Sequence, residues 1–156
     1  MVASNQWTVI RLLFVYGTLR QDVGNSAHKL LAENGSFFDY GYVHGRLLDL
    51  GRYPGMVLSE SSADTVFGEL WSLHSVNKAL YLLDQYEDVY PQSSVKKSMY
   101  RRVKHWVSSY RHQLVCAWLY TLAAEDVNAR PISGGDYLTY LHSNSNRFGA
   151  TDSFKC

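Results

Sequence analysis

The stretch LLFVYGTLR, residues 12–20, constrains the fold more than any other part of the sequence. A run rich in β-branched and aromatic residues that stops at Gly17 predicts a buried strand, here over residues 8–16. The backbone amides of Gly17, Thr18 and Leu19 then lie at the tip of that strand, where bare amides can hold an anion. A glycine after a strand is more often a simple turn, so the sequence leaves both interpretations open.

The rest of the chain predicts more strands and a few helices. Runs rich in β-branched and aromatic residues predict strands within 37–50, where glycines are expected to interrupt pairing, and at 65–73, 99–109 and 113–122. Capping residues predict helices at 25–35, 75–88 and 133–143, the first starting at Asn25 or Ser26 and ending at a Gly35 C-cap. GRYPGM, residues 51–56, is expected to be a loop.

These segments indicate one domain. Mostly antiparallel strands without a regular strand–helix alternation favour an α+β domain over a doubly wound sheet. We expect the domain to span residues 8–142, with a flexible C-terminal tail over 143–156, because that end is polar and rich in small residues.

Charge and motif content exclude several function classes. Fifteen basic residues oppose fourteen acidic ones, so no nucleic-acid or membrane partner is expected, and the basic YRRVKHW stretch is explained by one exposed strand face. The six histidines lack ligand spacing and no phosphate-binding loop occurs, so neither a metal nor a nucleotide cofactor is expected.

Cys116 has apolar neighbours and is interpreted as an inert core thiol. Two cysteines and no visible leader or membrane span favour a reducing compartment, so we expect a cytoplasmic protein.

Glu87 is an acidic residue on the apolar face of the predicted helix 75–88. At about 100° per residue, Glu87 falls inside the apolar arc centred on Leu80, one turn beyond Leu83, while Asp84 lies at its margin. An inward carboxylate at the negative end of a helix dipole should bind a proton more tightly than usual, as a general acid/base requires. The alternative is that the helix ends earlier and Glu87 points into water.

Six short motifs occur in order along the chain: VYGTLR at 15–20, GRYPGM at 51–56, FGELW at 67–71, LDQYED at 83–88, YRR at 100–102 and AWLY at 117–120. Together they resemble the γ-glutamylcyclotransferase-like family, especially its γ-glutamylamine cyclotransferase branch, over residues 12–140. Asp88, where many relatives have glycine, supports that branch, while the polar connection 89–99 is longer than is usual in the family and leaves substrate choice open.

The resemblance implies a fold and a site. The fold would be a small mixed, mostly antiparallel β-barrel with flanking helices and a cavity at the loop Tyr16-Gly17-Thr18-Leu19. Glu87 would occupy the catalytic carboxylate position. Four tyrosines are implied as walls of the substrate site, although a packed core position is equally open for each: Tyr16, Tyr53, Tyr100 and Tyr120.

The resemblance also implies a reaction. The α-amine of a small γ-glutamyl substrate attacks its own γ-carbonyl, giving 5-oxoproline and a free amine or amino acid, so no Ser, Cys, metal or cofactor is needed. Glu87 would move the proton, and the amides of residues 17–19 would bind either the substrate carboxylate or the oxyanion. The physiological amine and the oligomeric state do not follow from the sequence.

Two other functions stay open. The first is a non-catalytic domain of the same fold that binds a carboxylate metabolite, and the second is a structural interaction protein, which only the tyrosine content supports. Glu87 favours the enzyme, because a pure binding module would gain from a neutral residue at an inward position.

Overall fold

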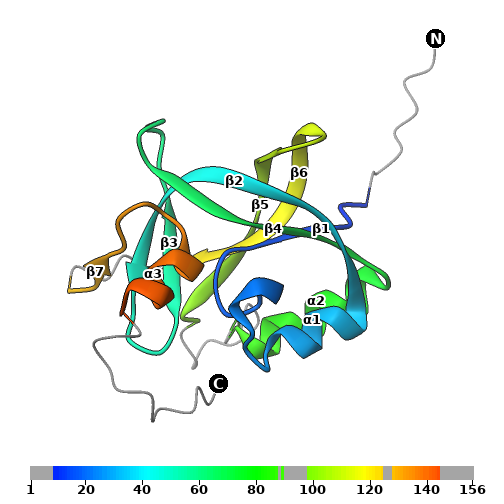
Figure 1. Ribbon diagram of the computed structural model, residues 1–156. Helices are drawn as coiled ribbons and strands as arrows, with labels where there is room; N and C mark the ends of the chain where they lie inside the picture. Colours follow the sequence, from blue (N-terminus) through cyan, green and yellow to red (C-terminus); the bar gives the residue numbers. More distant parts are fainter. Residues whose placement is uncertain (1–8, 88, 90–97, 125–127, 145–156) are drawn as a thin grey trace.

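The computed structural model describes residues 9–87, 89, 98–124 and 128–144, which form a closed β-barrel with three α-helices beside it (Figure 1). The barrel order is β2 (Gly35–Asp49), β4 (Thr65–Leu73), β1 (Leu12–Val15), β6 (Gln113–Leu122) and β5 (Tyr100–Ser109), and β5 returns to β2. Only the β1–β6 pairing in this barrel is parallel. The expected α+β fold, with a mixed and mostly antiparallel barrel, is therefore confirmed.

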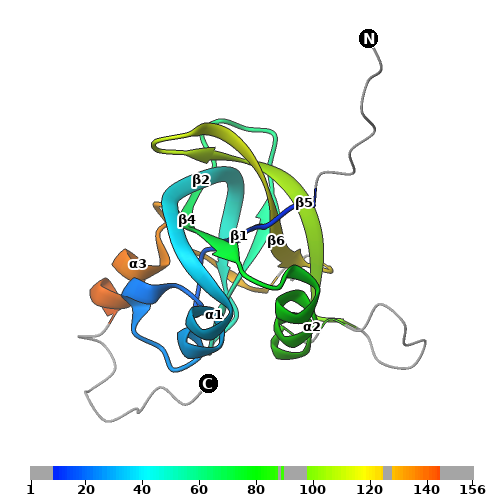
Figure 2. The same ribbon diagram turned by 90° about the vertical axis from the view of Figure 1, so that its right-hand side faces the viewer.

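Additional elements extend the barrel at one end. The strands β3 (Pro54–Leu58) and β7 (Arg130–Pro131) pair with the second half of β2. The helices α1 (His28–Asn34) and α2 (Val76–Tyr86) lie next to each other below the barrel in both views (Figures 1 and 2). The helix α3 (Tyr137–Asn144) lies beside the short 3-10 helix η1 (Gln21–Val23). Within the described residues, no helix has the length and hydrophobicity that crossing a bilayer requires.

β1 is apolar throughout because it is buried on both faces. Leu13 and Val15 pack in the cluster that the barrel shares with α1 and α2, together with Leu31, Leu80 and Leu83. Phe14 and Tyr16 turn the other way, into the cluster inside the barrel. Alternate residues of a strand point to opposite faces, so two cores in contact with one strand require a continuous apolar run.

Several boundaries differ from the predictions. β1 is shorter than the expected 8–16, and β2 continues through its glycines as one 15-residue strand. β2 stays extended because its successive parts pair with different strands, first β4 and β5, then β3 and β7. Only the first half of GRYPGM is a loop, because β3 pairs with β2 and begins at Pro54.

The first helix also differs from its prediction. Its N-cap position is Ala27, which has no capping side chain, and Asn25 instead accepts a hydrogen bond from the Ala27 N–H (2.9 Å). Gly35 is not a left-handed C-cap, because it is extended (φ −163°) and pairs with Leu73 of β4. The expected domain boundary after residue 142 falls inside α3, and residues 145–156 lie outside the described residues.

A buried carboxylate anchors the loop that follows β1. Glu69 of β4 is 1% exposed and accepts hydrogen bonds from the N–H groups of Gln21 (3.0 Å) and Asp22 (3.3 Å) and from the Trp71 indole (2.8 Å). Arg20 ties the same loop to the start of α3 through an ion pair with Asp136 (3.0 Å). The loop that leaves β1 is thus held from both sides.

We predict that Glu69→Gln destabilises the protein. The amide NH2 would face N–H donors that now meet a carboxylate oxygen, and a buried donor without an acceptor costs about 1–3 kcal/mol. Urea denaturation should show a free energy of unfolding lower by about that amount. Glu60→Gln, at an exposed position of the β3–β4 turn, is the matched control. Equal midpoints for the two variants would contradict the anchoring role.

Candidate functional site

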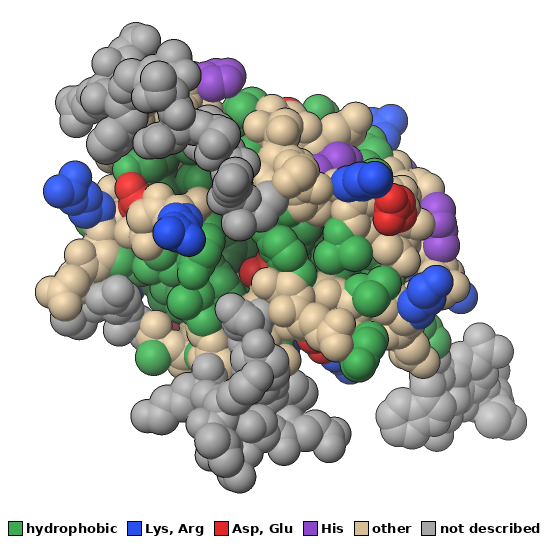
Figure 3. Space-filling view, turned by 90° about the horizontal axis from the view of Figure 1, so that it is seen from below, with side chains coloured by type: hydrophobic (Ala, Val, Ile, Leu, Met, Phe, Trp, Pro, Cys, Tyr) green, Lys and Arg blue, Asp and Glu red, His purple; other side chains and the backbone are tan. Residues whose placement is uncertain are grey.

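A cavity of about 160 Å³ opens where β1 ends. Seen from below, the molecule is hollowed there, with an acidic side chain among hydrophobic ones and Lys or Arg side chains to one side (Figure 3). The lining residues come from several separate parts of the chain: Phe14, Val15, Tyr16, Gly17, Thr18, Leu19, Asn25, Arg52, Tyr53, Pro54, Tyr86, Glu87, Met99, Tyr100 and Tyr120.

The structure brings every residue predicted for the site to this cavity. The loop after β1 supplies four of them, the β2–β3 hairpin one, α2 and its end one, and β5 and β6 one each: Tyr16, Gly17, Thr18, Leu19, Tyr53, Glu87, Tyr100 and Tyr120.

Gly17 is needed for close packing and not for an unusual backbone angle. Its φ lies outside the positive region, whereas a Cβ at this position would lie 2.7 Å from Cγ of Pro54. The glycine is therefore required by the proximity of Pro54 and not by the backbone angle of the turn. The turn itself exists, because Arg20 N–H donates to the Gly17 carbonyl (3.0 Å). Since neither Thr18 nor Leu19 has positive φ, the turn is not of type II.

The amides of this turn are available to a ligand. None of the hydrogen bonds formed among the described residues uses the N–H groups of Gly17, Thr18 or Leu19 as donors. Backbone N–H groups rarely stay without an acceptor when they are away from water. At the wall of a cavity they form a place where negative charge is stabilised.

Three tyrosines are held in place by their own hydroxyl groups. Tyr16 donates to the backbone carbonyl of Tyr120 (2.7 Å), and Tyr100 donates to the carbonyl of Pro54 (2.7 Å). Tyr120 donates to Asp84 (2.7 Å), whose other oxygen accepts from Arg102 (2.8 Å). All three rings are at least 94% buried, since their exposed fractions are 6%, 5% and 3%. They are rigid walls of the cavity and parts of the core at the same time.

Glu87 lies at the end of α2, close to these phenol groups. It occupies the C-cap position, is half-buried, and its N–H donates to the carbonyl of Leu83 (2.9 Å). Burial raises the pKa of Tyr16, Tyr100 and Tyr120, and the negative charge of Glu87 adds to the increase at each of them. Glu87 lines the cavity and is not fully exposed. Its higher proton affinity stays a prediction.

The apolar arc that placed Glu87 inward is confirmed. Ala79, Leu80 and Leu83 are the buried residues of α2. Asp84, at the margin of the arc, is half-buried and pairs with Arg102 outside the cavity lining. The sequence identified the position of Asp84 on the helix but not its two partners, which are Arg102 of β5 and Tyr120 of β6.

Sequence reasoning missed part of the lining. Arg52 and Pro54 lie in GRYPGM, in which only Tyr53 was singled out, and Tyr86 directly precedes Glu87. The motif was therefore a signal for these residues. Asn25 was expected only as a helix cap, and no pattern pointed to Met99. Asp88 and most of the connection 89–99 lie outside the described residues.

The lining restricts what the cavity can do chemically. Among its described residues Glu87 is the only carboxylate, Arg52 is the only cation, and there is no Ser, Cys, His or Lys. No group of three or more His, Cys, Asp or Glu side chains in the described part of the chain is placed to hold a metal ion. The described lining thus offers one carboxylate for proton transfer and no Ser or Cys nucleophile.

Cys116 is not the core thiol that was expected. It is half-buried on the outer side of β6, opposite Trp106 of β5, whose side chain is 63% exposed. Its neighbour Ala117 points into the barrel instead. An apolar sequence context could not distinguish the two sides of a strand whose outer face also carries apolar residues.

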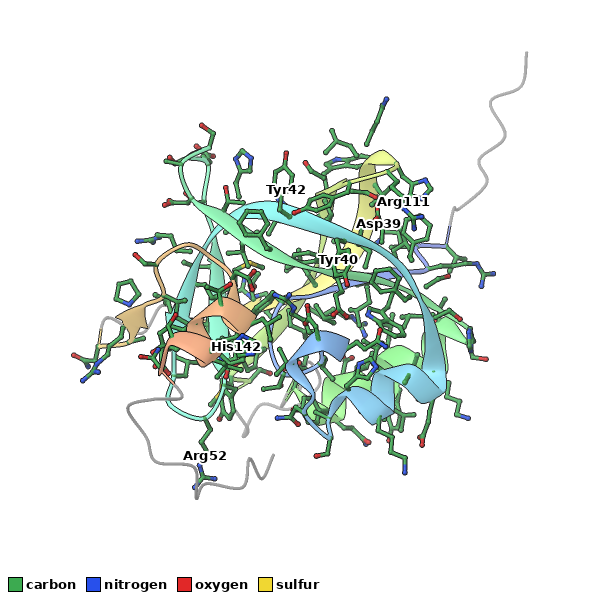
Figure 4. The ribbon with its side chains drawn as sticks, viewed as in Figure 1. Asp39, Tyr40, Tyr42, Arg52, Arg111 and His142 are labelled. Carbon is green, nitrogen blue, oxygen red and sulfur yellow. The ribbon has the colours of Figure 1, made fainter. Side chains whose placement is uncertain are left out.

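A second buried carboxylate lies away from the cavity and has a structural role. Asp39 is 3% exposed and accepts hydrogen bonds from Ser109 and from the N–H groups of Tyr40 and Arg111. Figure 4 shows Asp39 and Arg111 together at the β5–β6 turn, on the opposite side of the molecule from Arg52. Burial acts to raise its pKa, but the Ser109 hydrogen bond and the other donors outweigh that and keep the carboxyl pKa below its usual value. This cluster fastens the turn onto β2 near its bulge.

Residues 13–139 match the sequence model of a family described as gamma-glutamyl cyclotransferase, AIG2-like. Among solved structures, the chain is similar to YkqA from Bacillus subtilis (TM-score 0.67, 23% identity), covering 88% of this chain but only 43% of that one. It is also similar to an AIG2-like protein from Mus musculus (TM-score 0.64, 22% identity, 83% and 89% covered). A further match is a gamma-glutamyl cyclotransferase (TM-score 0.55, 17% identity, 90% and 80% covered). A search of curated proteins finds no significant match.

We predict that stability falls as the pH rises above about 10. In the unfolded chain tyrosine ionises near that pH, whereas the pKa values of Tyr16, Tyr100 and Tyr120 are raised in the folded protein. The unfolded state therefore binds fewer protons above pH 10 and gains stability relative to the folded state. Urea denaturation in a series from about pH 8 to about pH 11 measures this slope. A free energy of unfolding that stays constant throughout would contradict the burial of these phenol groups.

Proposed function

The chain belongs to the gamma-glutamyl cyclotransferase, AIG2-like family, and on that premise we propose that it converts a γ-glutamyl amine or peptide into 5-oxoproline and a free amine. The observation that carries the proposal is the position of Glu87 in the wall of the cavity, where the described lining residues include no other carboxylate and no Ser or Cys. A reaction whose nucleophile belongs to the substrate matches such a cavity.

The reaction proceeds from the neutral α-amine of the substrate. Its nitrogen attacks the γ-carbonyl carbon, the carbonyl electron pair moves to oxygen, and Glu87 takes a proton from the attacking nitrogen. When the carbonyl forms again, the bond to the leaving nitrogen breaks and Glu87 returns the proton to it. One γ-glutamyl amine thus gives one 5-oxoproline and one free amine, and the carboxylate is regenerated.

The other lining residues bind and orient the substrate. The buried phenol rings of Tyr16, Tyr100 and Tyr120 hold the substrate in the conformation that brings its amine to its γ-carbonyl. An intramolecular attack gains much of its rate from such positioning. The N–H groups of Gly17, Thr18 and Leu19 supply stabilisation for negative charge, either on the substrate carboxylate or on the oxyanion. The hydroxyls of Tyr16, Tyr100 and Tyr120 donate to protein acceptors, which favours Glu87 over these three for proton transfer.

We expect 5-oxoproline from at least one member of a small panel: γ-glutamyl-alanine, γ-glutamyl-ε-lysine and glutathione. Chromatographic detection of 5-oxoproline after incubation is the measurement, with heat-denatured protein as the control for spontaneous cyclisation. Measurable binding of these compounds without any product would favour the non-catalytic carboxylate-binding domain.

Glu87→Gln should abolish turnover and leave substrate affinity within about tenfold, because the shape is kept and only proton transfer is lost. Glu33→Gln, at an exposed position of α1, is the matched control and should keep full activity. The two variants are compared by 5-oxoproline formation and by calorimetric titration of substrate. Similar turnover in both would remove Glu87 from the mechanism.

A further inference from the structure

Arg52 lies at the tip of the β2–β3 hairpin and lines the cavity. Leu50 N–H donates to the carbonyl of Tyr53 (3.1 Å), so Gly51 and Arg52 form a two-residue hairpin loop. Gly51 has a φ of 100° and Arg52 is not among the residues with positive φ, which is the φ pattern of a type II′ turn. Such a tight turn fixes the backbone of Arg52 relative to Tyr53, which also lines the cavity.

The side chain of Arg52 has no internal role. It is exposed and points away from the hairpin tip (Figure 4). Within the part of the chain that the structure describes, it forms no hydrogen bond or ion pair. Three other arginines differ, since each is paired with an aspartate: Arg20, Arg102 and Arg111. Arg52 therefore leaves a positive charge at the rim of the cavity.

The size of the cavity decides which part of a substrate meets that rim. A volume of about 160 Å³ is below the roughly 300–1,000 Å³ of sites that enclose a drug-sized ligand. A glutamyl group that folds into a ring is small enough to occupy it. The group on the departing nitrogen must then extend outward, toward the rim where Arg52 and the exposed Met99 lie.

The charges of Glu87 and Arg52 predict the same orientation of the substrate in the cavity. Glu87 attracts the α-ammonium form of a substrate, which releases one proton to solvent before the neutral amine attacks, and Arg52 attracts negative charge and repels positive charge. A substrate whose positive end lies at Glu87 presents its other end to Arg52.

We propose that Arg52 is a specificity-determining residue that binds a carboxylate on the leaving group, so that acidic leaving groups are preferred over neutral ones and cationic ones are disfavoured. The inference rests on the proposed function. The amides of residues 17–19, which donate to no acceptor among the described residues, remain for negative charge within the glutamyl unit, on its carboxylate or on the oxyanion.

Three substrates that differ in one group test the proposal. γ-Glutamyl-alanine has a carboxylate on the leaving group, γ-glutamyl-ethylamide lacks it, and γ-glutamyl-(2-aminoethyl)amide carries an ammonium instead. For the wild-type protein kcat/KM should fall in that order, with about three- to tenfold between the first two, as expected for one exposed charge-assisted pair. The preference should shrink at high salt, because exposed charges are screened.

Variants of Arg52 separate this role from others. Arg52→Gln should abolish the preference and keep kcat/KM for the neutral substrate within about twofold, while Arg52→Lys should retain part of the preference. Arg11→Gln, exposed just before β1 at its far end from the cavity, is the matched control and should behave as wild type. Titrations in the Glu87→Gln background measure binding of the same substrates without turnover.

The outcomes are distinct. Equal loss for all three substrates in Arg52→Gln would overturn the proposal, because Arg52 would then act on the shared glutamyl unit. Equal kcat/KM for the three substrates in the wild-type protein would overturn it as well. If no substrate gives 5-oxoproline, the proposed function fails instead, and the calorimetric affinities still decide whether Arg52 distinguishes the charge of the group at the rim.

Discussion

Burial of β1 on both faces is the constraint on which the rest of the structure depends. Leu13 and Val15 join the barrel to the two helices below it, and Phe14 and Tyr16 fill the barrel from within. β1 has four residues and is paired with β4 on one side and β6 on the other. The position of the turn that follows β1 is therefore fixed. The cavity lies at that place because the loop after β1, the β2–β3 hairpin and the end of α2 meet there.

Close packing at the end of β1 brings the walls of the cavity together. Pro54 lies so near to Gly17 that no side chain fits between them, which brings the β2–β3 hairpin to the loop after β1. Tyr100 donates to the carbonyl of the same proline, and Tyr16 donates to the backbone of β6. Glu69 and Arg20 hold the outgoing loop. The amides of the turn are therefore kept in a fixed position, which favours a preorganised electrostatic role over induced fit.

The predictions from sequence succeeded where a pattern was local and strong. The helical arc of α2 located Glu87 on its inward side, and the strands 65–73 and 113–122 agree with β4 and β6. They failed where pairing partners decided the outcome. Gly35 became the first residue of a strand because it pairs with Leu73, and Cys116 lies on the outer side of β6 because Ala117 faces the barrel. In the site, the motifs contained Arg52 and Pro54, but neither residue has a property that marks it as lining until Gly17 and Pro54 meet.

By itself, the sequence determined the chemical types available to this protein: an inward carboxylate after an apolar helix, a buried strand that ends at a glycine, and tyrosines in ordered motifs. These follow from periodicity and composition, which are local properties of a chain. Only the tertiary structure decided that the groups share one small cavity, that the hydroxyls of three tyrosines are used internally, and that Arg52 has no partner among the described residues at the rim. Those facts depend on contacts between residues up to 104 positions apart, and such contacts arise from closure of the barrel, which no local pattern encodes.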